Sequence, residues 1–206
     1  MGKVLARLLE SIPIQILLNI VIYAAYASIL GICLVPSVML VHGVWRATSP
    51  LTTAGDLVLI SLASGGALFT YFITGALVMA LVIRIISWGI KPGRYPMVSL
   101  TMVRWLLYSG IYQLAGATIL TFIPMGFLLT AFFRIIGAKL GKNVRLNSWH
   151  LNDAYLLEMG DNVVVGGKTD VSCHTFEKGH LILQNVKIGS NTLIGQGCYI
   201  SPGVTM

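Results

Sequence analysis

The sequence contains few charged residues. Only 10% of its 206 residues are Asp, Glu, Lys or Arg, while 56% are hydrophobic. A soluble domain usually carries about 25% charged residues. Three stretches, 11–45, 57–83 and 105–133, contain no charged side chain at all, and each is longer than the ~20 residues that a helix needs to cross a bilayer. This composition excludes an ordinary soluble chain and predicts an integral membrane protein with a compact domain attached.

Acidic residues are especially scarce, with seven Asp and Glu against 14 Lys and Arg, which gives a formal net charge of +7. Residues 1–133 hold seven basic and two acidic residues, and residues 134–206 hold seven and five. The excess positive charge therefore flanks the apolar stretches, as expected beside membrane lipids. No basic stripe with interleaved aromatic residues is present, so the sequence argues against a nucleic-acid partner.

Cysteine is also rare, since the chain has only three: Cys33, Cys173 and Cys198. An odd number without a disulfide framework is typical of a reducing compartment. We expect Cys198 to be a small core residue. Cys173 precedes His174 and has the chemistry of a nucleophile, but no third group that would orient the pair is evident.

The basic residues predict how the chain crosses the membrane. The linker at 84–104 contains four basic residues and no acid, and cytoplasmic loops are enriched in Lys and Arg. Lys3 and Arg7 would place the N-terminus on the same side, so stretches 11–45 and 57–83 form a hairpin. The stretch 105–133 has basic flanks at both ends. We therefore expect a re-entrant or surface-lying pair there, with a third crossing as the alternative.

A six-residue repeat occupies the end of the chain, residues 140–206. Its eight hexads begin with aliphatic residues, and the second position is Gly in five of them; the first positions are Leu140, Leu146, Met159, Val165, Val171, Ile188, Ile194 and Ile200. A fixed short period is the signature of a solenoid, in which each repeat buries its apolar side against its neighbours. Three such faces make a coil of about 18 residues. We expect about three coils of a parallel β-helix over residues 134–206, after a helical region over residues 1–133.

This repeat resembles the hexapeptide-repeat acyltransferases, whose fold is a left-handed parallel β-helix. The resemblance implies left-handedness, a trimer with active sites between subunits, and a His as general base. The repeat is interrupted once, at residues 177–187, and His174 stands just before that interruption. Imidazole suits this role because its usual pKa lies near neutral pH. The resemblance thus makes His174 the catalytic base, while an ordinary exposed His is the alternative.

A second resemblance covers residues 57–206. The linker sequence WGIKPGRYP, the following VRWLL and the segment FRIIGAKLG are similar to the membrane-embedded C-terminal modules of poly-amino-acid synthetases of the ε-poly-lysine type, which are non-ribosomal peptide synthetases. Those modules also share a His-x-Phe-Glu stretch, matched by His174, Phe176 and Glu177. The family carries such modules in tandem behind adenylation and carrier domains, whereas this chain contains one module and no carrier.

Four further polar residues are candidates for the site. Glu177 is a second catalytic candidate, because it can orient the imidazole, and Asp170 can hold an amine acceptor. Asn152 and Asp153 lie in a seven-residue irregularity of the first coil, and the second resemblance implies that Asp153 reaches a substrate groove. Solvated loop acids and turn residues are the alternative roles for these groups.

Together these features predict a transferase in the inner membrane with its β-helix facing the cytoplasm. It would move an acyl or aminoacyl group from an acyl-CoA or carrier-protein thioester to an amine or hydroxyl, without a bound cofactor. We expect a homotrimer or pseudo-trimer, with a carrier protein or synthetase as partner. The alternatives are a non-catalytic trimerising scaffold and, less favoured, a carbonic-anhydrase-like zinc site at His150, His174 and His180.

Overall fold

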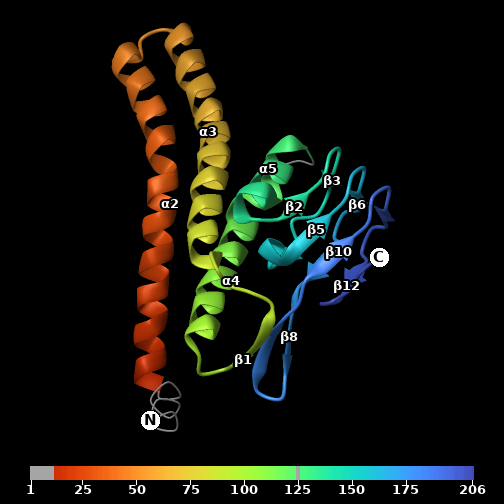
Figure 1. The fold of residues 1–206 in the computed structure, drawn as a ribbon. Helices are drawn as coiled ribbons and strands as arrows, with labels where there is room; N and C mark the ends of the chain where they lie inside the picture. The colour runs from red at the N-terminus through yellow and green to blue at the C-terminus, as the bar shows by residue number, and fades with distance from the viewer. Residues whose placement is uncertain (1–11, 124–125) are drawn as a thin grey trace. The chain divides into compact units, whose positions relative to one another are not determined.

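The computed structural model describes residues 12–123 and 126–206 (Figure 1). Lys3 and Arg7, which entered the topology prediction, lie outside these ranges. The described chain divides into two compact units: a helical unit that ends at residue 78 and a sheet unit over residues 79–206. Each unit is described by itself below.

The helical unit is built from α2 (Ile12–Thr48) and most of α3 (Ala54–Ser87). Segments Ile22–Thr48 and Ala54–Ser87 are long and apolar enough to cross a membrane. Two hydroxyl groups join the helices, because Ser37 Oγ donates to the Ala67 carbonyl at 2.8 Å and Thr74 Oγ1 donates to the Cys33 carbonyl at 3.2 Å. The predicted pair of apolar helices is therefore present.

The third apolar stretch contains two helices, as expected for a pair of segments. Helix α4 (Leu100–Thr118) begins at Ser99, whose hydroxyl accepts the Met102 N–H at 3.1 Å and so caps the helix. A short 3-10 turn, η1 (Leu120–Phe122), separates it from α5 (Phe127–Ile136). Helix α5 ends at Gly137, which adopts the left-handed conformation with φ of 114°, where glycine is favoured because it has no Cβ.

The rest of the sheet unit contains three parallel sheets of three strands each, in the orders β10-β5-β2, β11-β6-β3 and β12-β7-β4. The chain visits these sheets in the same order three times. The strands are β2 (Lys139–Leu140), β3 (Arg145–Leu146), β4 (Leu151–Asn152), β5 (Leu157–Met159), β6 (Val164–Val165), β7 (Asp170–Ser172), β10 (Val186–Ile188), β11 (Leu193–Ile194) and β12 (Tyr199–Ile200).

The strand register aligns the first positions of the hexads. Met159 pairs with both Leu140 and Ile188, and Val165 pairs with both Leu146 and Ile194. In the third sheet Val171 lies between Ile200 and Leu151, and Leu151 follows Leu146 by five residues instead of six. All of these side chains except Leu140 are buried, so the aligned aliphatic rows form the core of this region.

A second row follows the turns that precede β3, β6 and β11. Asn143 donates its side-chain amide to Asn162 at 3.1 Å, and Asn162 donates to Asn191 at 3.0 Å. All three residues have φ between 55° and 60°, the left-handed region that Asn tolerates better than most residues. This row of three residues is called the asparagine ladder below.

The expectation that Cys198 is a core residue is wrong. Cys198 is exposed, whereas Cys173 and Cys33 are buried. The reason is its position in the turn before β12, which is an outer strand of its sheet. A fifth hexad position is therefore enclosed only where neighbouring coils cover it.

The interruption of the repeat folds into a hairpin of β8 (His174–Glu177) and β9 (His180–Leu183). Strand β1 (Gly93–Pro96), from the basic linker, pairs antiparallel with β9. The resulting sheet, β1-β9-β8, is the only antiparallel sheet among the described residues (Figure 1). It joins the segment before α4 to the strand that carries His174.

Candidate functional site

Helix α4 presents a row of aromatic side chains to the rest of the sheet unit. Trp105, Tyr108 and Tyr112 are spaced three and four residues apart and are at most 5% exposed, as expected for one face of a helix. The Tyr112 hydroxyl donates to the Trp149 carbonyl and accepts the Leu151 N–H at 3.2 Å. Helix α4 is thereby fixed to the start of β4.

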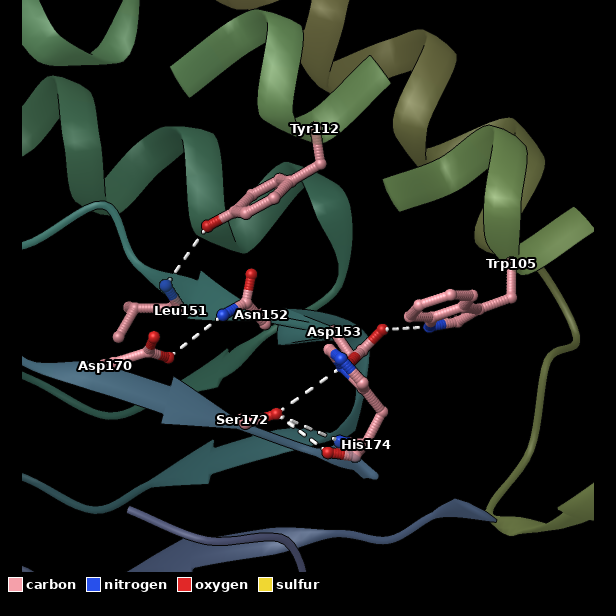
Figure 2. A network of polar contacts seen from close by, with 8 residues as sticks. All are labelled: Trp105, Tyr112, Leu151, Asn152, Asp153, Asp170, Ser172 and His174. Carbon is pink, nitrogen blue, oxygen red and sulfur yellow. Dashed lines mark hydrogen bonds and ion pairs between the residues drawn. The ribbon is translucent and has the colours of Figure 1, made fainter. Parts of the chain in front are cut away.

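Asp153 is the centre of the polar network in Figure 2. It follows β4 in a left-handed conformation (φ 55°, ψ 43°) and is only 1% exposed. One carboxylate oxygen accepts the indole N–H of Trp105 at 2.7 Å. The other makes a short hydrogen bond to Nδ1 of His174. A buried carboxylate needs such donors, because an unpaired charge is costly to bury.

His174 opens β8, and its side chain is 23% exposed. Its ring lies against the Trp105 indole, with 4.8 Å between ring centroids and 63° between planes. The Phe176 ring contacts the same indole at 5.4 Å. Ser172 holds the backbone here, since its hydroxyl donates to the His174 carbonyl at 2.9 Å. The imidazole is therefore held by the Asp153 carboxylate and the Trp105 ring and still reaches solvent.

This arrangement determines which ring nitrogen is available for chemistry. An ionised carboxylate only accepts hydrogen bonds, so the bond to Asp153 requires a proton on Nδ1 of His174. In the neutral ring Nε2 then carries the lone pair. Among the described residues no hydrogen bond to Nε2 is found. A carboxylate that orients an imidazole in this way leaves Nε2 free to accept a proton from a substrate.

Two buried side chains influenced by the Asp153 charge, the Tyr155 phenol and the Cys173 thiol, remain protonated and uncharged. Burial raises the pKa of the Tyr155 phenol far above its usual value, and the Asp153 charge raises it further. Burial likewise raises the pKa of the Cys173 thiol, with Asp153 as the second cause. A protonated thiol is a poor nucleophile, so the geometry does not favour Cys173 as the reacting group.

The structure brings some of the predicted residues together and separates others. Asn152 donates to Asp170 at 3.0 Å across β4 and β7, and Asn152 is paired in register with Ser172. Asn152 directly precedes Asp153, whereas Asp170 lies on β7 two residues before Ser172. Glu177 is an exposed residue with an ion pair to Lys178 at 3.9 Å. Because strand side chains alternate, Glu177 lies on the opposite face of β8 from His174.

The three histidines considered for zinc occupy separate environments. The His150 ring stacks on Trp149 with 4.0 Å between centroids, and Nδ1 of His180 contacts the Lys178 carbonyl at 2.9 Å. Nδ1 of His174 is held by Asp153. In residues 12–123 and 126–206 no group of three or more His, Cys, Asp or Glu side chains has the geometry of a metal site.

Trp105 is the site residue that the sequence did not single out. Its hydrogen bond to Asp153 spans 48 positions in the chain. The available signal was the sequence VRWLL at 103–107, which carried part of the second resemblance but did not give the direction of the indole.

Comparisons with known proteins give one partial similarity. No family model and no solved structure matches the chain. A delta-poly-L-ornithine synthetase from Acinetobacter baumannii (strain AB307-0294) is 31% identical over 118 residues, which cover 54% of this chain and 8% of that protein. The chain therefore corresponds to a small part of a much longer relative. The similarity supports a relationship with a synthetase-associated family and a role related to a biosynthetic enzyme.

Proposed function

We propose that this chain is a membrane-bound transferase that moves an acyl or aminoacyl group from a thioester to an amine or hydroxyl acceptor. The observation that carries the proposal is the buried Asp153 carboxylate that holds Nδ1 of the partly exposed His174. A His whose second nitrogen is free and accessible has the geometry of a general base. The name of the relative, a poly-ornithine synthetase, favours an amine acceptor and an amide product.

In the proposed reaction Nε2 of His174 removes a proton from the acceptor amine as its nitrogen attacks the thioester carbonyl. The new C–N bond forms, and the C–S bond then breaks. The departing sulfur takes the proton back from the imidazolium, so the products are an amide and a free thiol. Asp153 stabilises the charged imidazolium in between, and Trp105 fixes that carboxylate. In this proposal Asn152 and Asp170 bind the acceptor, and Glu177 has no part in the reaction.

The proposed architecture follows the aligned aliphatic rows. The three parallel sheets are taken as the faces of a left-handed parallel β-helix of about three coils, assembled as a homotrimer or with related modules. The two apolar helices would anchor it in the inner membrane, with the sheet unit in the cytoplasm. The donor, an acyl-CoA or a carrier-bound thioester, is a substrate, so no resident cofactor is needed.

The proposal is tested with the full chain purified in mild detergent. Acetyl-CoA and a lysyl N-acetylcysteamine thioester, which imitates the end of a carrier arm, are offered with L-ornithine as acceptor. Free thiol is measured by colorimetry and amide by mass spectrometry. His174→Ala is expected to lower turnover by about 10²- to 10⁴-fold, the usual contribution of a positioned general base.

Glu177→Gln is the matched control, because Glu177 lies three residues away on the other face of the same strand. We expect it to retain turnover within about threefold of the wild type, since it does not touch the ring. A folded His174→Ala protein with wild-type turnover would exclude the catalytic role. Absence of transfer with both donors, together with an intact trimer by native mass spectrometry, would favour a scaffold instead.

A further inference from the structure

One cleft in the sheet unit lies apart from the Asp153 and His174 network. It has a volume of about 470 Å³ and contains none of the residues shown in Figure 2. Its walls come from the start of α5 and from the turn before β3; the lining residues are Gly126, Phe127, Thr130, Arg134, Asn143, Val144 and Arg145. This volume is within the range of small-ligand sites, about 300 to 1,000 Å³.

The charge of the cleft has one sign. Arg134 and Arg145 both line it, and its lining contains no Asp or Glu. Within residues 12–123 and 126–206 no arginine takes part in an ion pair. Two guanidinium groups in one cleft repel each other unless an anion lies between them. The cleft is therefore suited to a negatively charged ligand.

The two arginines differ in how they are held. Arg134 donates from one terminal nitrogen to the carbonyls of Gly141 at 2.8 Å and Leu140 at 3.4 Å, which fixes its position. Arg145 is exposed, and no hydrogen bond of its guanidinium is found among the described residues. A fixed and an adjustable guanidinium together can bind several oxygens of one group, which favours phosphate over a halide.

Part of the cleft is apolar. Phe127 is 79% exposed at one wall, and Val144 is buried at another. An exposed ring beside two cations suits a ligand in which a phosphate is attached to an apolar or aromatic group. We propose that this cleft binds the phosphate of such a ligand, either a phospholipid headgroup or a soluble phosphate ester. The inference concerns binding alone and does not depend on His174 being a base.

The test uses the full chain in detergent at a fixed ionic strength of about 150 mM, where long-range attraction is screened. Inorganic pyrophosphate, titrated by calorimetry, represents the soluble source. Dioleoyl phosphatidylglycerol in mixed micelles, with phosphatidylcholine as the neutral comparison and native mass spectrometry as readout, represents the lipid source. The variants are Arg145→Ala and, as matched control, Lys142→Ala, which removes an exposed cation from the same turn outside the cleft lining.

We expect one of the two probes to bind the wild type and Arg145→Ala to weaken it at least tenfold, as the loss of a charge-assisted hydrogen bond predicts. Lys142→Ala should change the affinity by less than about twofold. Binding of pyrophosphate assigns a soluble ester, and selective retention of phosphatidylglycerol alone assigns a lipid. The proposal is overturned if neither probe binds the wild type, or if Lys142→Ala weakens binding as much as Arg145→Ala.

Discussion

The helical unit and the sheet unit satisfy their polar side chains in opposite ways. In the helical unit most hydroxyl groups donate to a carbonyl four residues earlier in the same helix, as Ser61, Ser64 and Thr70 do. In the sheet unit several bonds reach far along the chain, 48 positions from Trp105 to Asp153 and 29 from Asn162 to Asn191. The first pattern is local, and the second requires the complete fold.

The two hydrogen-bonding patterns have different consequences for the surroundings of each unit and for its sensitivity to change. A hydroxyl satisfied within its own helix leaves the outer surface apolar, which suits hydrocarbon surroundings. A carboxylate satisfied by two distant segments keeps its geometry only while both segments remain in place. The candidate site should therefore respond to small changes in the sheet unit, whereas substitutions confined to the helical unit should leave its geometry unchanged.

The largest effect is expected at Asp153. Asp153→Asn keeps an oxygen for the Trp105 N–H but presents an amide donor to His174 Nδ1, which favours the wrong tautomer. Activity should fall by about 10³- to 10⁴-fold with the fold retained. Asp153→Ala also leaves the buried Trp105 N–H without an acceptor, so the free energy of unfolding should drop by about 1–3 kcal/mol.

Asp56→Asn is the control for Asp153→Asn in the helical unit. Asp56 is partly exposed and accepts the Thr53 N–H at 2.9 Å at the start of α3, so its substitution should affect the helix end and leave turnover unchanged. Turnover is measured with the thioester assay and stability by denaturant titration. Full activity of Asp153→Asn would contradict the role assigned to the carboxylate.

A pair of glycine substitutions compares packing in the two units. A Cβ on Gly116 would lie 2.2 Å from the Trp149 ring, whereas a Cβ on Gly65 meets nothing within 4 Å. Gly116→Ala should therefore destabilise the sheet unit by about 1–3 kcal/mol through overpacking. Gly65→Ala should stabilise α3 by about 0.5–1 kcal/mol. Circular dichroism and tryptophan fluorescence during thermal unfolding would report both; shifts of the same sign would refute the contrast.

The smallest effect is expected at an exposed ion pair of the sheet unit. Lys139 Nζ lies 2.6 Å from a Glu158 oxygen, and this hydrogen bond lowers the pKa of the Glu158 carboxyl. Since the folded-state pKa is below the unfolded value, the pair stabilises the fold above the usual Glu range. That stabilisation is lost as pH falls through the folded-state pKa.

Both partners are accessible to water, with 75% and 33% of their side chains exposed, so the contribution is only about 0.2–1 kcal/mol. Glu158→Gln should therefore reduce the difference in unfolding free energy between pH 7 and pH 3.5 by that amount. Adding salt should reduce the wild-type difference in the same direction. An unchanged pH dependence in Glu158→Gln would show that the pair contributes nothing.

The sequence predicted the elements whose signal is local or periodic. The uncharged stretches 11–45 and 57–83 became α2 and α3, and the hexad first positions became the aligned rows of the three sheets. The helix ends differ by a few residues because caps decide them: Arg104, for example, donates to the Ile86 carbonyl at 2.8 Å near the end of α3. A periodic pattern shows which side chains face inward but not where a helix stops.

The site itself was less accessible to sequence reasoning. His174 was found through the interrupted repeat, but the group that orients it was sought next to it, at Glu177. Because side chains alternate along a strand, Glu177 lies on the opposite face of β8 from His174. The orienting carboxylate is Asp153, 21 positions earlier, in a turn that breaks the repeat. No period relates these two residues or Trp105, so only the folded chain brings them together.

The asparagine ladder shows that the coils keep their register across the interruption of the repeat. Its steps span 19 and 29 residues, yet both steps make the same amide bond, so the extra ten residues cause no shift in register. Those residues correspond to the β8–β9 hairpin. The turn at the tip of this hairpin, beyond His174, can therefore differ in length or sequence without shifting the coils on either side. Under the proposed function, substrate preference can diverge at this tip while Asp153 and the frame that positions it stay constant.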